Sequence, residues 1–231
     1  MAPPRFDWIT FDCYGTLIDW ERGISDAFTA QAGRKGRTVD RSSVLDVYHA
    51  VEPVVEAETY RRYREVLGFA AEQVVERLGW TVPPEGTGFL AESLPSWPPF
   101  SDTNPALARL AGGGVKLGIL SNVDDDLLAG TRRHFGVPFD LIVTAQQVGS
   151  YKPARGHFTT ARARLPAGAR WLHAAQSYFH DVVPCKALGI PVAWINRKRQ
   201  PVGSAGAPDR EFRDLTGLAD WVLEKDGGRR Q

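Results

Sequence analysis

Five short apolar runs alternate with helically spaced segments, and this alternation constrains the fold more than any other feature of the sequence. WITF (8–11) stops at a Gly-containing loop, as a buried strand does before a functional turn. Similar runs follow at KLGIL (116–120), DLIVTA (140–145), RWLHAA (170–175) and PVAWINR (191–197). Helical spacing lies between them, at roughly 103–112, 124–135, 154–164 and 180–188. Strands that alternate with helices form βαβ units, so we predict a doubly wound α/β fold with a parallel sheet.

Residues 21–97 interrupt this alternation with a long, charged and helically periodic stretch that contains no strand-like run. We predict an inserted helical domain there, with an α/β core made of residues 1–20 and 98–231. The expected hinges are 19–22 and the proline-rich PSWPPF (95–100), because prolines exclude helix and stiffen a crossing. RKRQPVGSAGAPDR (197–210) is predicted to be a surface loop, and LADWVLE (218–224) a closing helix.

Charge and cysteine content limit the classes of partner and compartment. The 231 residues carry 28 Lys and Arg against 27 Asp and Glu, so no overall field favours nucleic acid or an anionic membrane. No apolar run approaches the roughly 20 residues that span a bilayer. Cys13 and Cys185 are the only cysteines, and the sequence opens without a secretion signal. We therefore expect a cytoplasmic protein with both thiols reduced.

Polar residues follow four of the apolar runs, where each predicted strand ends. They are Asp12, the pair Ser121 and Asn122, the pair Tyr151 and Lys152, and the stretch from Gln176 to Asp181. In open parallel sheets, ligands bind at the carboxyl ends of the strands. These four groups are therefore expected to converge on one site.

The order of these motifs resembles a known family. FDCYGTL, ILSN, SYKP and SYFHD, the last followed by ALGIPVAWINR, are similar in order and spacing to the haloacid dehalogenase superfamily of aspartate-nucleophile hydrolases. Within it, FDCYGTLIDW and GIPVAWINR look most like the branch that contains the L-2-haloacid dehalogenases. The resemblance implies a Rossmann-like core with a helical cap at 21–97 and a hydrolase activity.

The resemblance implies that Asp12 is the nucleophile. A carboxylate at a strand end can attack carbon or phosphorus and form an ester that water then hydrolyses. The alternative is a turn aspartate that bonds its own backbone. Phosphatases of the superfamily carry a second aspartate two residues later, which protonates the departing alkoxide, whereas this chain has Tyr14. A halide needs no proton, so this position favours a dehalogenase.

Three further residues take catalytic roles from the resemblance. Lys152 is expected beside Asp12, where its charge would lower the pKa of the carboxylate. Asp181 is expected either to orient Lys152 or to activate the water that opens the ester. Thr16 is expected to contact Asp12.

The predicted substrate-binding residues depart from the dehalogenase pattern at several positions. Ser121 and Asn122 are expected to orient a substrate oxyanion, with capping of the next helix as the alternative. An arginine is expected early in the cap, but ungapped placement puts His49 there; Phe158 replaces a tyrosine. The Ser-Asn pair that the dehalogenases carry in the fourth motif has become Gln176-Ser177-Tyr178, and His180, beside Asp181, is a further candidate base. The predicted set is Tyr14, Ser121, Asn122, His49, Gln176 and Ser177.

Metal binding is disfavoured by the fourth motif. Phosphatase relatives read Gly-Asp-Ser, while this chain has Ala175-Gln176-Ser177, so one anionic ligand has become a neutral amide. If Mg²⁺ bound, its ligands would be Asp12, Tyr14 and Asp181. We expect no cofactor.

Three functions are consistent with these residues. The first is a metal-independent hydrolase that removes halide from a short 2-haloacid through an alkyl-aspartyl ester. The second is a Mg²⁺-assisted phosphatase of a small phosphate ester, and the third is a non-catalytic binding protein on the same fold. The expected partner is a small molecule, a short carboxylic acid, and the chain is a candidate homodimer.

Overall fold

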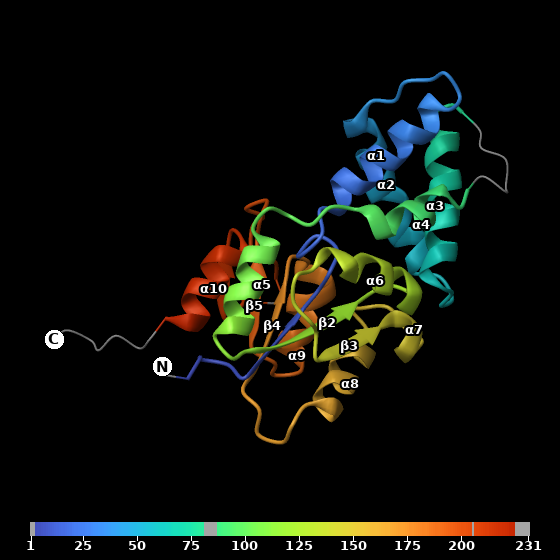
Figure 1. Cartoon of the computed structure of the whole chain (residues 1–231). Helices are drawn as coiled ribbons and strands as arrows, with labels where there is room; N and C mark the ends of the chain where they lie inside the picture. The colour runs from blue at the N-terminus through green and yellow to red at the C-terminus, as the bar shows by residue number, and fades with distance from the viewer. Residues whose placement is uncertain (1–2, 81–86, 205, 225–231) are drawn as a thin grey trace.

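The α/β core is built on one parallel sheet (Figure 1). The computed structural model describes residues 3–80, 87–204 and 206–224. In this part of the chain the sheet has six strands in the order β3-β2-β1-β4-β5-β6. Their bounds are β1 Trp8–Phe11, β2 Lys116–Ser121, β3 Leu141–Thr144, β4 Trp171–Ala175, β5 Val192–Ile195 and β6 Arg210–Phe212. The five predicted strands and the doubly wound α/β class are confirmed.

Both faces of the sheet are buried, as a parallel sheet requires. On β5, Val192 and Trp194 pack into one apolar cluster, whereas Ala193 and Ile195 pack into another. Because successive side chains of a strand point to opposite faces, the sheet separates two cores. The helices of the α/β core are α5 Thr103–Gly112, α6 Asp125–Thr131, α7 Ala145–Val148, α8 Gly156–Arg164, α9 Val183–Ala187 and α10 Leu215–Leu223. Helices α5 and α10 pack side by side, while α8 packs against β2 and β3 (Figure 1).

A group of helices follows β1 and stands apart from the sheet at the upper right of Figure 1. Its members are α1 Trp20–Gly33, α2 Arg41–Glu56, α3 Tyr63–Arg77, α4 Phe89–Ser93 and the 3₁₀ turn η2 Leu94–Ser96. Asp19 and Asp40 cap α1 and α2 by accepting hydrogen bonds from the amides of Arg22 and Ser43. We call this group the cap helices. Residues 81–86 of the predicted insertion lie outside the described residues.

The cap helices are fastened to the core at the start of α3. The Asp124 carboxylate, at the N-terminus of α6, accepts hydrogen bonds from the amides of Tyr63 (3.0 Å) and Arg64 (3.1 Å). These are amides that the first turn of α3 leaves without helical partners. Asp124 is the N-cap residue of α6, so neither Ser121 nor Asn122 caps this helix.

Three local features differ from the sequence-based predictions. Strand β6 is not predicted by the sequence pattern, and its first residue falls in the predicted loop 197–210, of which residue 205 lies outside the described residues. The segment predicted as one helix over 180–188 is a π-helical turn, η4 Tyr178–Val182, followed by α9. The helix predicted over 124–135 ends in a 3₁₀ turn, η3 Arg132–His134.

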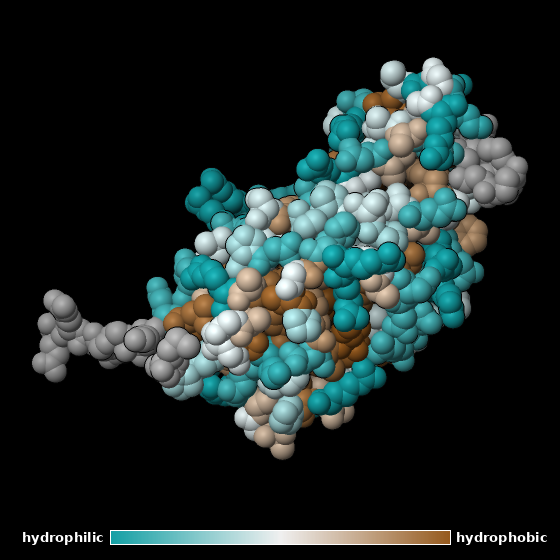
Figure 2. Space-filling view, in the orientation of Figure 1, coloured by the Kyte–Doolittle hydropathy of each residue, from teal (hydrophilic) through white to brown (hydrophobic). Residues whose placement is uncertain are grey.

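The surface is mixed in character. In the orientation of Figure 2, hydrophilic residues cover much of the cap helices. Over the core, areas of hydrophobic residues are visible among the hydrophilic ones. Among the described residues, the large hydrophobic side chains that are exposed are Val54, Phe69, Phe179 and Val202. No helix in the described part of the chain is long and apolar enough to cross a membrane.

Candidate active site

Asp12 lies immediately after β1, where the chain turns sharply. The turn needs a glycine at position 15, because φ is +94° there and a Cβ would come within 3.0 Å of the Gln176 Oε1 and 3.1 Å of the Trp20 indole nitrogen. The turn brings Thr16 back toward Asp12. The Thr16 hydroxyl donates to Asp12 Oδ2 at 2.9 Å, as predicted, and accepts from the Gln176 amide.

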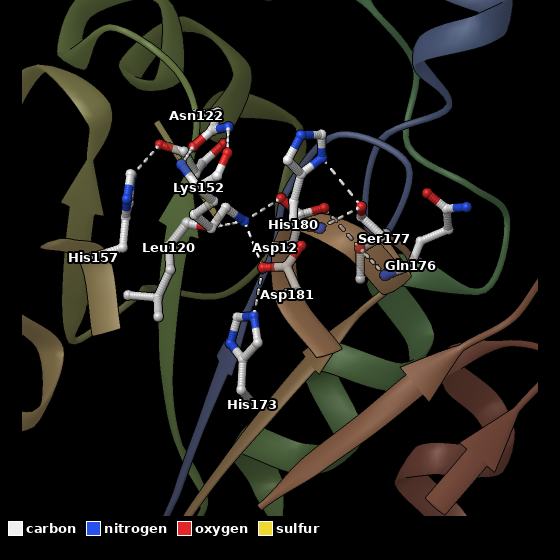
Figure 3. A network of polar contacts seen from close by, with 12 residues as sticks. Asp12, Leu120, Asn122, Lys152, His157, His173, Gln176, Ser177, His180 and Asp181 are labelled. Carbon is white, nitrogen blue, oxygen red and sulfur yellow. Dashed lines mark hydrogen bonds and ion pairs between the residues drawn. The ribbon is translucent and has the colours of Figure 1, made fainter. Parts of the chain in front are cut away.

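Lys152 joins two carboxylates at the centre of the site (Figure 3). Its ammonium donates to Asp12 Oδ1 at 2.8 Å, to Asp181 Oδ1 at 2.7 Å and to the Leu120 carbonyl at 2.9 Å. All three protons of the ammonium are thereby used. The side chain is 1% exposed, so these ion pairs form away from solvent.

A second set of hydrogen bonds holds Asp181 from below the site. The Trp171 indole donates to the Thr10 hydroxyl (2.8 Å), Thr10 contacts His173 Nδ1 (2.9 Å), and His173 Nε2 contacts Asp181 Oδ1 (2.9 Å). An indole only donates and a carboxylate only accepts. We therefore assign His173 the tautomer that donates from Nε2 to Asp181 and accepts at Nδ1 from the hydroxyl of Thr10.

Burial and charge act against each other in this network. Burial raises the pKa of Asp12, and Lys152 opposes the rise without cancelling it, so the predicted net lowering is not found. Burial would also raise the pKa of Asp181, but the charge of Lys152 and the hydrogen bond from His173 outweigh it and hold that pKa well below its usual range. The two carboxylates raise the pKa of Lys152, despite its burial. Asp181 and Lys152 are therefore charged at neutral pH.

A pocket of about 450 Å³ opens above Asp12, between the strand ends and the cap helices. Asp12, Lys152 and Asp181 line it from the core, and α2 contributes His49 and Glu56. The other predicted residues that border it are Tyr14, Ser121, Asn122, Gln176 and Ser177. The four polar groups that follow the strands thus converge, as expected from a parallel sheet.

Ser121 and Asn122 differ in what they can offer a ligand. The Ser121 hydroxyl is buried and makes no hydrogen bond within the described structure, so it is available as a donor. Asn122 is fully engaged: its carbonyl accepts from the Lys152 amide (2.7 Å), and its NH₂ donates to the Lys152 carbonyl (3.1 Å) and to Glu56 (3.0 Å). Asn122 therefore holds the loop that carries Lys152.

The hydroxyl of Tyr14 is held by a hydrogen bond to Thr131. The Thr131 hydroxyl donates to the Leu127 carbonyl, so it accepts from Tyr14 at 3.0 Å. Burial also raises the pKa of Tyr14 well above its usual value. A phenol that already donates and has a high pKa is a poor proton source, in agreement with a leaving group that departs unprotonated.

Gln176, Ser177 and His49 border the pocket in different ways. Gln176 is held through its backbone by Thr16 and by the Trp194 indole. The Ser177 hydroxyl caps η4 by accepting from the His180 amide. His49 lies over Trp20 and contacts Glu21, with 3.3 Å between Nε2 and Oε1.

Four residues with evident roles were missed in the sequence. Glu52 and Glu56 border the pocket from the same face of α2 as His49, at positions i+3 and i+7. Arg197 follows β5, stacks on Phe100, pairs with Asp102 and donates to the Thr16 carbonyl (2.8 Å). Arg197 follows a predicted strand, and this position could have indicated a site residue. His173 lies inside β4, where nothing in the sequence indicates a functional role.

Among the described residues, no group of three or more His, Cys, Asp or Glu side chains is arranged to hold a metal ion. The space between Asp12 Oδ1 and Asp181 Oδ1 is taken by the ammonium of Lys152. Gln176, which borders the same pocket, is a neutral residue.

A strand-end carboxylate beside a buried lysine, beneath helices inserted after the first strand, defines a class of α/β hydrolases. The model of the haloacid dehalogenase-like hydrolase family matches residues 6–174, and the chain belongs to this family.

Individual relatives agree with this assignment. (S)-2-haloacid dehalogenase H-109 of Pseudomonas putida is 27% identical over 231 residues, which cover 94% of this chain and 97% of that protein. Haloacid dehalogenase-like hydrolase domain-containing protein 3 of Danio rerio is 34% identical and covers 83% of this chain and 85% of its own length. The structure of L-2-haloacid dehalogenase from Xanthobacter autotrophicus with chloropropionic acid covalently bound has a TM-score of 0.80 at 21% identity, covering 94% of this chain and 98% of that one. At that identity the structural likeness shows the fold.

Proposed function

We propose that this protein cleaves the carbon–halogen bond of a small 2-halogenated carbonyl compound, with Asp12 as the nucleophile and without a metal ion. The observation that carries the proposal is the contact between Lys152 Nζ and Asp12 Oδ1, which lie 2.8 Å apart at the pocket. Two residues after Asp12, where a phosphatase has a second acid, this chain has Tyr14. The relatives named for 2-haloacids support the choice of substrate class.

In the first step, a carboxylate oxygen of Asp12 attacks the sp³ carbon from the side opposite the halogen. The carbon–halogen bond breaks, the halide leaves with the bonding electrons, and an alkyl-aspartyl ester forms with inversion at carbon. Lys152 and Thr16 hold the two Asp12 oxygens and fix the carboxylate in orientation. The Xanthobacter protein carrying covalently bound chloropropionic acid supports a covalent step.

In the second step, water attacks the ester carbonyl and releases the 2-hydroxy product with a proton, which restores Asp12. Asp181 was predicted either to orient Lys152 or to activate this water. Its lowered pKa makes it a weak base, while its 2.7 Å contact with Lys152 supports the orienting role. We assign it that role.

The remaining features of the proposal concern the setting of the reaction. The proposed domains are a cap at 21–97 and a core made of 1–20 and 98–231. The cap helices cover the site and limit access of water. The lack of a need for Mg²⁺ follows from Lys152, whose ammonium already bridges the two carboxylates that would bind it. Cys13 and Cys185 are both free and buried, in keeping with a cytoplasmic enzyme. A homodimer is part of the proposal on resemblance alone.

The test is halide release from a panel of small 2-halogenated acids and amides in excess chelator. Wild-type protein should release halide, and Asp12→Asn should not exceed the blank. Asp220→Asn, on the surface and paired with Arg109, is the matched control and should retain wild-type rates. If no compound loses halide, but a phosphate ester is hydrolysed in the presence of Mg²⁺ and this hydrolysis stops when chelator is added, the phosphatase alternative replaces the proposal. Absence of all turnover would leave a binding protein.

A further inference from the structure

The pocket above Asp12 holds more acid than base. Six acidic side chains border it, namely Asp12, Asp19, Glu21, Glu52, Glu56 and Asp181. In the described part of the chain, three lysine or arginine side chains border the same pocket, and each is already paired with an acid. Lys152 bridges Asp12 and Asp181, Arg197 pairs with Asp102, and Lys198 pairs with Glu21. An incoming anion therefore meets no uncommitted cation among these side chains.

The cap side of the pocket is the acidic side. Glu52 and Glu56 lie one turn apart on α2, and both border the pocket. Glu52 accepts from the Tyr63 hydroxyl at 3.3 Å, and Glu56 accepts from Asn122 at 3.0 Å. The Glu56 side chain is only 9% exposed, and its Oε2 lies 3.6 Å from the Nε2 of His180. Burial and the neighbouring Glu52 raise the pKa of Glu56 to about 8.

His49 does not replace a cap arginine as a receptor for anions. Its imidazole lies 3.3 Å from Glu21, and the hydrogen bond from His49, with further help from Lys198, lowers the pKa of Glu21 to about 2 despite partial burial. Any positive charge on His49 is therefore balanced by an ionised acid. The cap side of the pocket, opposite Asp12, therefore presents the carboxyl groups of Glu52 and Glu56 on α2. The raised pKa of Glu56 lets that group donate as well as accept a hydrogen bond near neutral pH.

A substrate carboxylate and an uncharged substrate amide differ in the free-energy cost of entering this pocket. Burying a carboxylate without a cation is costly, whereas a neutral amide needs only hydrogen bonds. An amide NH₂ can donate to a carboxyl oxygen of Glu56 whether that group is ionised or protonated. The amide carbonyl can accept from the Ser121 hydroxyl, which has no partner in the described structure.

We propose that the group beside the halogen-bearing carbon of the substrate is an uncharged hydrogen-bond donor and acceptor of the primary amide class, and that Glu56 and Ser121 select it over a carboxylate. This inference rests on the proposed function. The reaction then converts a 2-haloamide and water into the 2-hydroxyamide, a proton and halide. Asp12 forms the bond to carbon as halide leaves, and water later cleaves the ester.

The first experiment compares 2-chloropropionamide with 2-chloropropionate, which share the reacting carbon and the leaving group. The wild type should show kcat/KM at least about tenfold higher for the amide, since a factor of ten is about 1.4 kcal/mol, well within the cost of an unpaired buried charge. A higher kcat/KM for the carboxylate would overturn the inference and leave the dehalogenase proposal standing.

Binding decides the inference without turnover. In the Asp12→Asn protein, titration calorimetry with propionamide and with propionate should show tighter binding of the amide. Tighter binding of propionate overturns the inference even if no halide is ever released. Loss of halide release from both chloro compounds, together with tighter binding of propionamide, would instead remove the proposed reaction and leave the selectivity.

Two variants test the residues. His49→Arg adds a cation at a half-exposed cap position and should raise the ratio of acid to amide turnover. Ala50→Arg, at the next exposed position of α2 and not among the residues that line the pocket, adds the same single charge and should not. Glu56→Gln keeps an acceptor but removes the acid, so it should narrow the preference for the amide over the carboxylate, measured as the ratio of the two kcat/KM values, about tenfold. An unchanged preference in both His49→Arg and Glu56→Gln would overturn the assignment to the cap face.

Discussion

The two sides of the pocket are built in different ways. On the core side, Asp12, Lys152 and Asp181 come from three separate segments of the chain and meet through hydrogen bonds of 2.7–2.8 Å, with His173 behind them. On the cap side, Glu52 and Glu56 come from one face of α2, and each makes one hydrogen bond or a longer ionic contact. The core side fixes its charges rigidly, whereas the cap side holds acids whose protonation is open to change.

This difference indicates that the core side of the pocket carries the reacting groups and the cap side determines substrate selectivity. A nucleophile must be held in a defined orientation, and the strand ends supply that through several independent elements. A substrate-recognising face needs only the right polarity, which a single helix can change by one or two substitutions. The departures from the dehalogenase pattern include one on the cap side, at His49, and leave Asp12, Lys152 and Asp181 in place.

The largest effect is expected from Lys152→Met, which removes the shared cation from the core side. Two buried carboxylates would then face each other without compensation, which costs about 3–5 kcal/mol of folding free energy. Halide release should fall by about a hundredfold to a thousandfold, since a preorganised charge is lost. Urea unfolding and steady-state kinetics measure the two effects.

Lys116→Met is the matched control, because Lys116 pairs with Asp140 at the exposed start of β2. It should change stability by less than about 1 kcal/mol and leave turnover unchanged. If Lys152→Met kept wild-type kcat, the core side would no longer differ from the cap side as proposed.

Thr10→Val should have the next largest effect, because it breaks the hydrogen bonds that orient His173. The change leaves the Trp171 indole and His173 Nδ1 without their partner, at a cost of about 1–3 kcal/mol. Thr10→Ser keeps the hydroxyl and should restore most of that stability. Thermal unfolding of the pair measures the effect, and equal loss in both variants would indicate packing instead of the hydrogen bonds.

Glu56→Gln should change how stability depends on pH. The pKa of Glu56 rises from 4.5 to about 8 on folding, so the folded state holds a proton that the unfolded state loses. Its contribution is fully present below pH 4.5, falls as pH rises, and is gone above about pH 8. The variant should therefore be less sensitive to pH in this window.

The groups that face Glu56 titrate or carry charge themselves: Glu52 on α2, His180 on η4, and Lys152 with Asp12 at the strand ends. They are common to wild type and variant, so the difference between the two curves reports Glu56. Glu58→Gln, an exposed acid just beyond α2, should give the wild-type curve. Parallel curves for wild type and Glu56→Gln would contradict the cap-side description.

The sequence predicted the core side far better than the cap side, for physical reasons. Asp12, Lys152 and Asp181 follow apolar runs, and parallel strands bring their carboxyl ends together whatever the intervening chain does. Glu52 and Glu56 lie on an amphipathic helix, where an acid gives no sign of whether it faces solvent or a pocket. Strand β6 escaped notice because REF is short and polar, as an edge strand is.

The smallest loss of stability is expected from Arg64→Ala, which removes an exposed ion pair between the cap helix α3 and the core helix α6. Arg64 is 42% exposed and pairs with Asp126, and more loosely with Asp124. Arg64→Ala should therefore cost less than about 1 kcal/mol, and the loss should fade in high salt. Arg61→Ala, whose partner Glu58 belongs to the same segment, is the control for a lost arginine.

The reason for so small an effect is that other contacts also hold the cap helices on the core. They share one apolar cluster with the core, and the Asp124 carboxylate, which accepts from the Tyr63 amide at 3.0 Å, is not altered by the change. Denaturant titrations at low and high salt measure it. A loss above about 2 kcal/mol that persists in high salt would mean that Arg64 supports the cap through packing of its stem. In that case the cap side would depend on the core for its position as rigidly as Asp12 depends on Lys152.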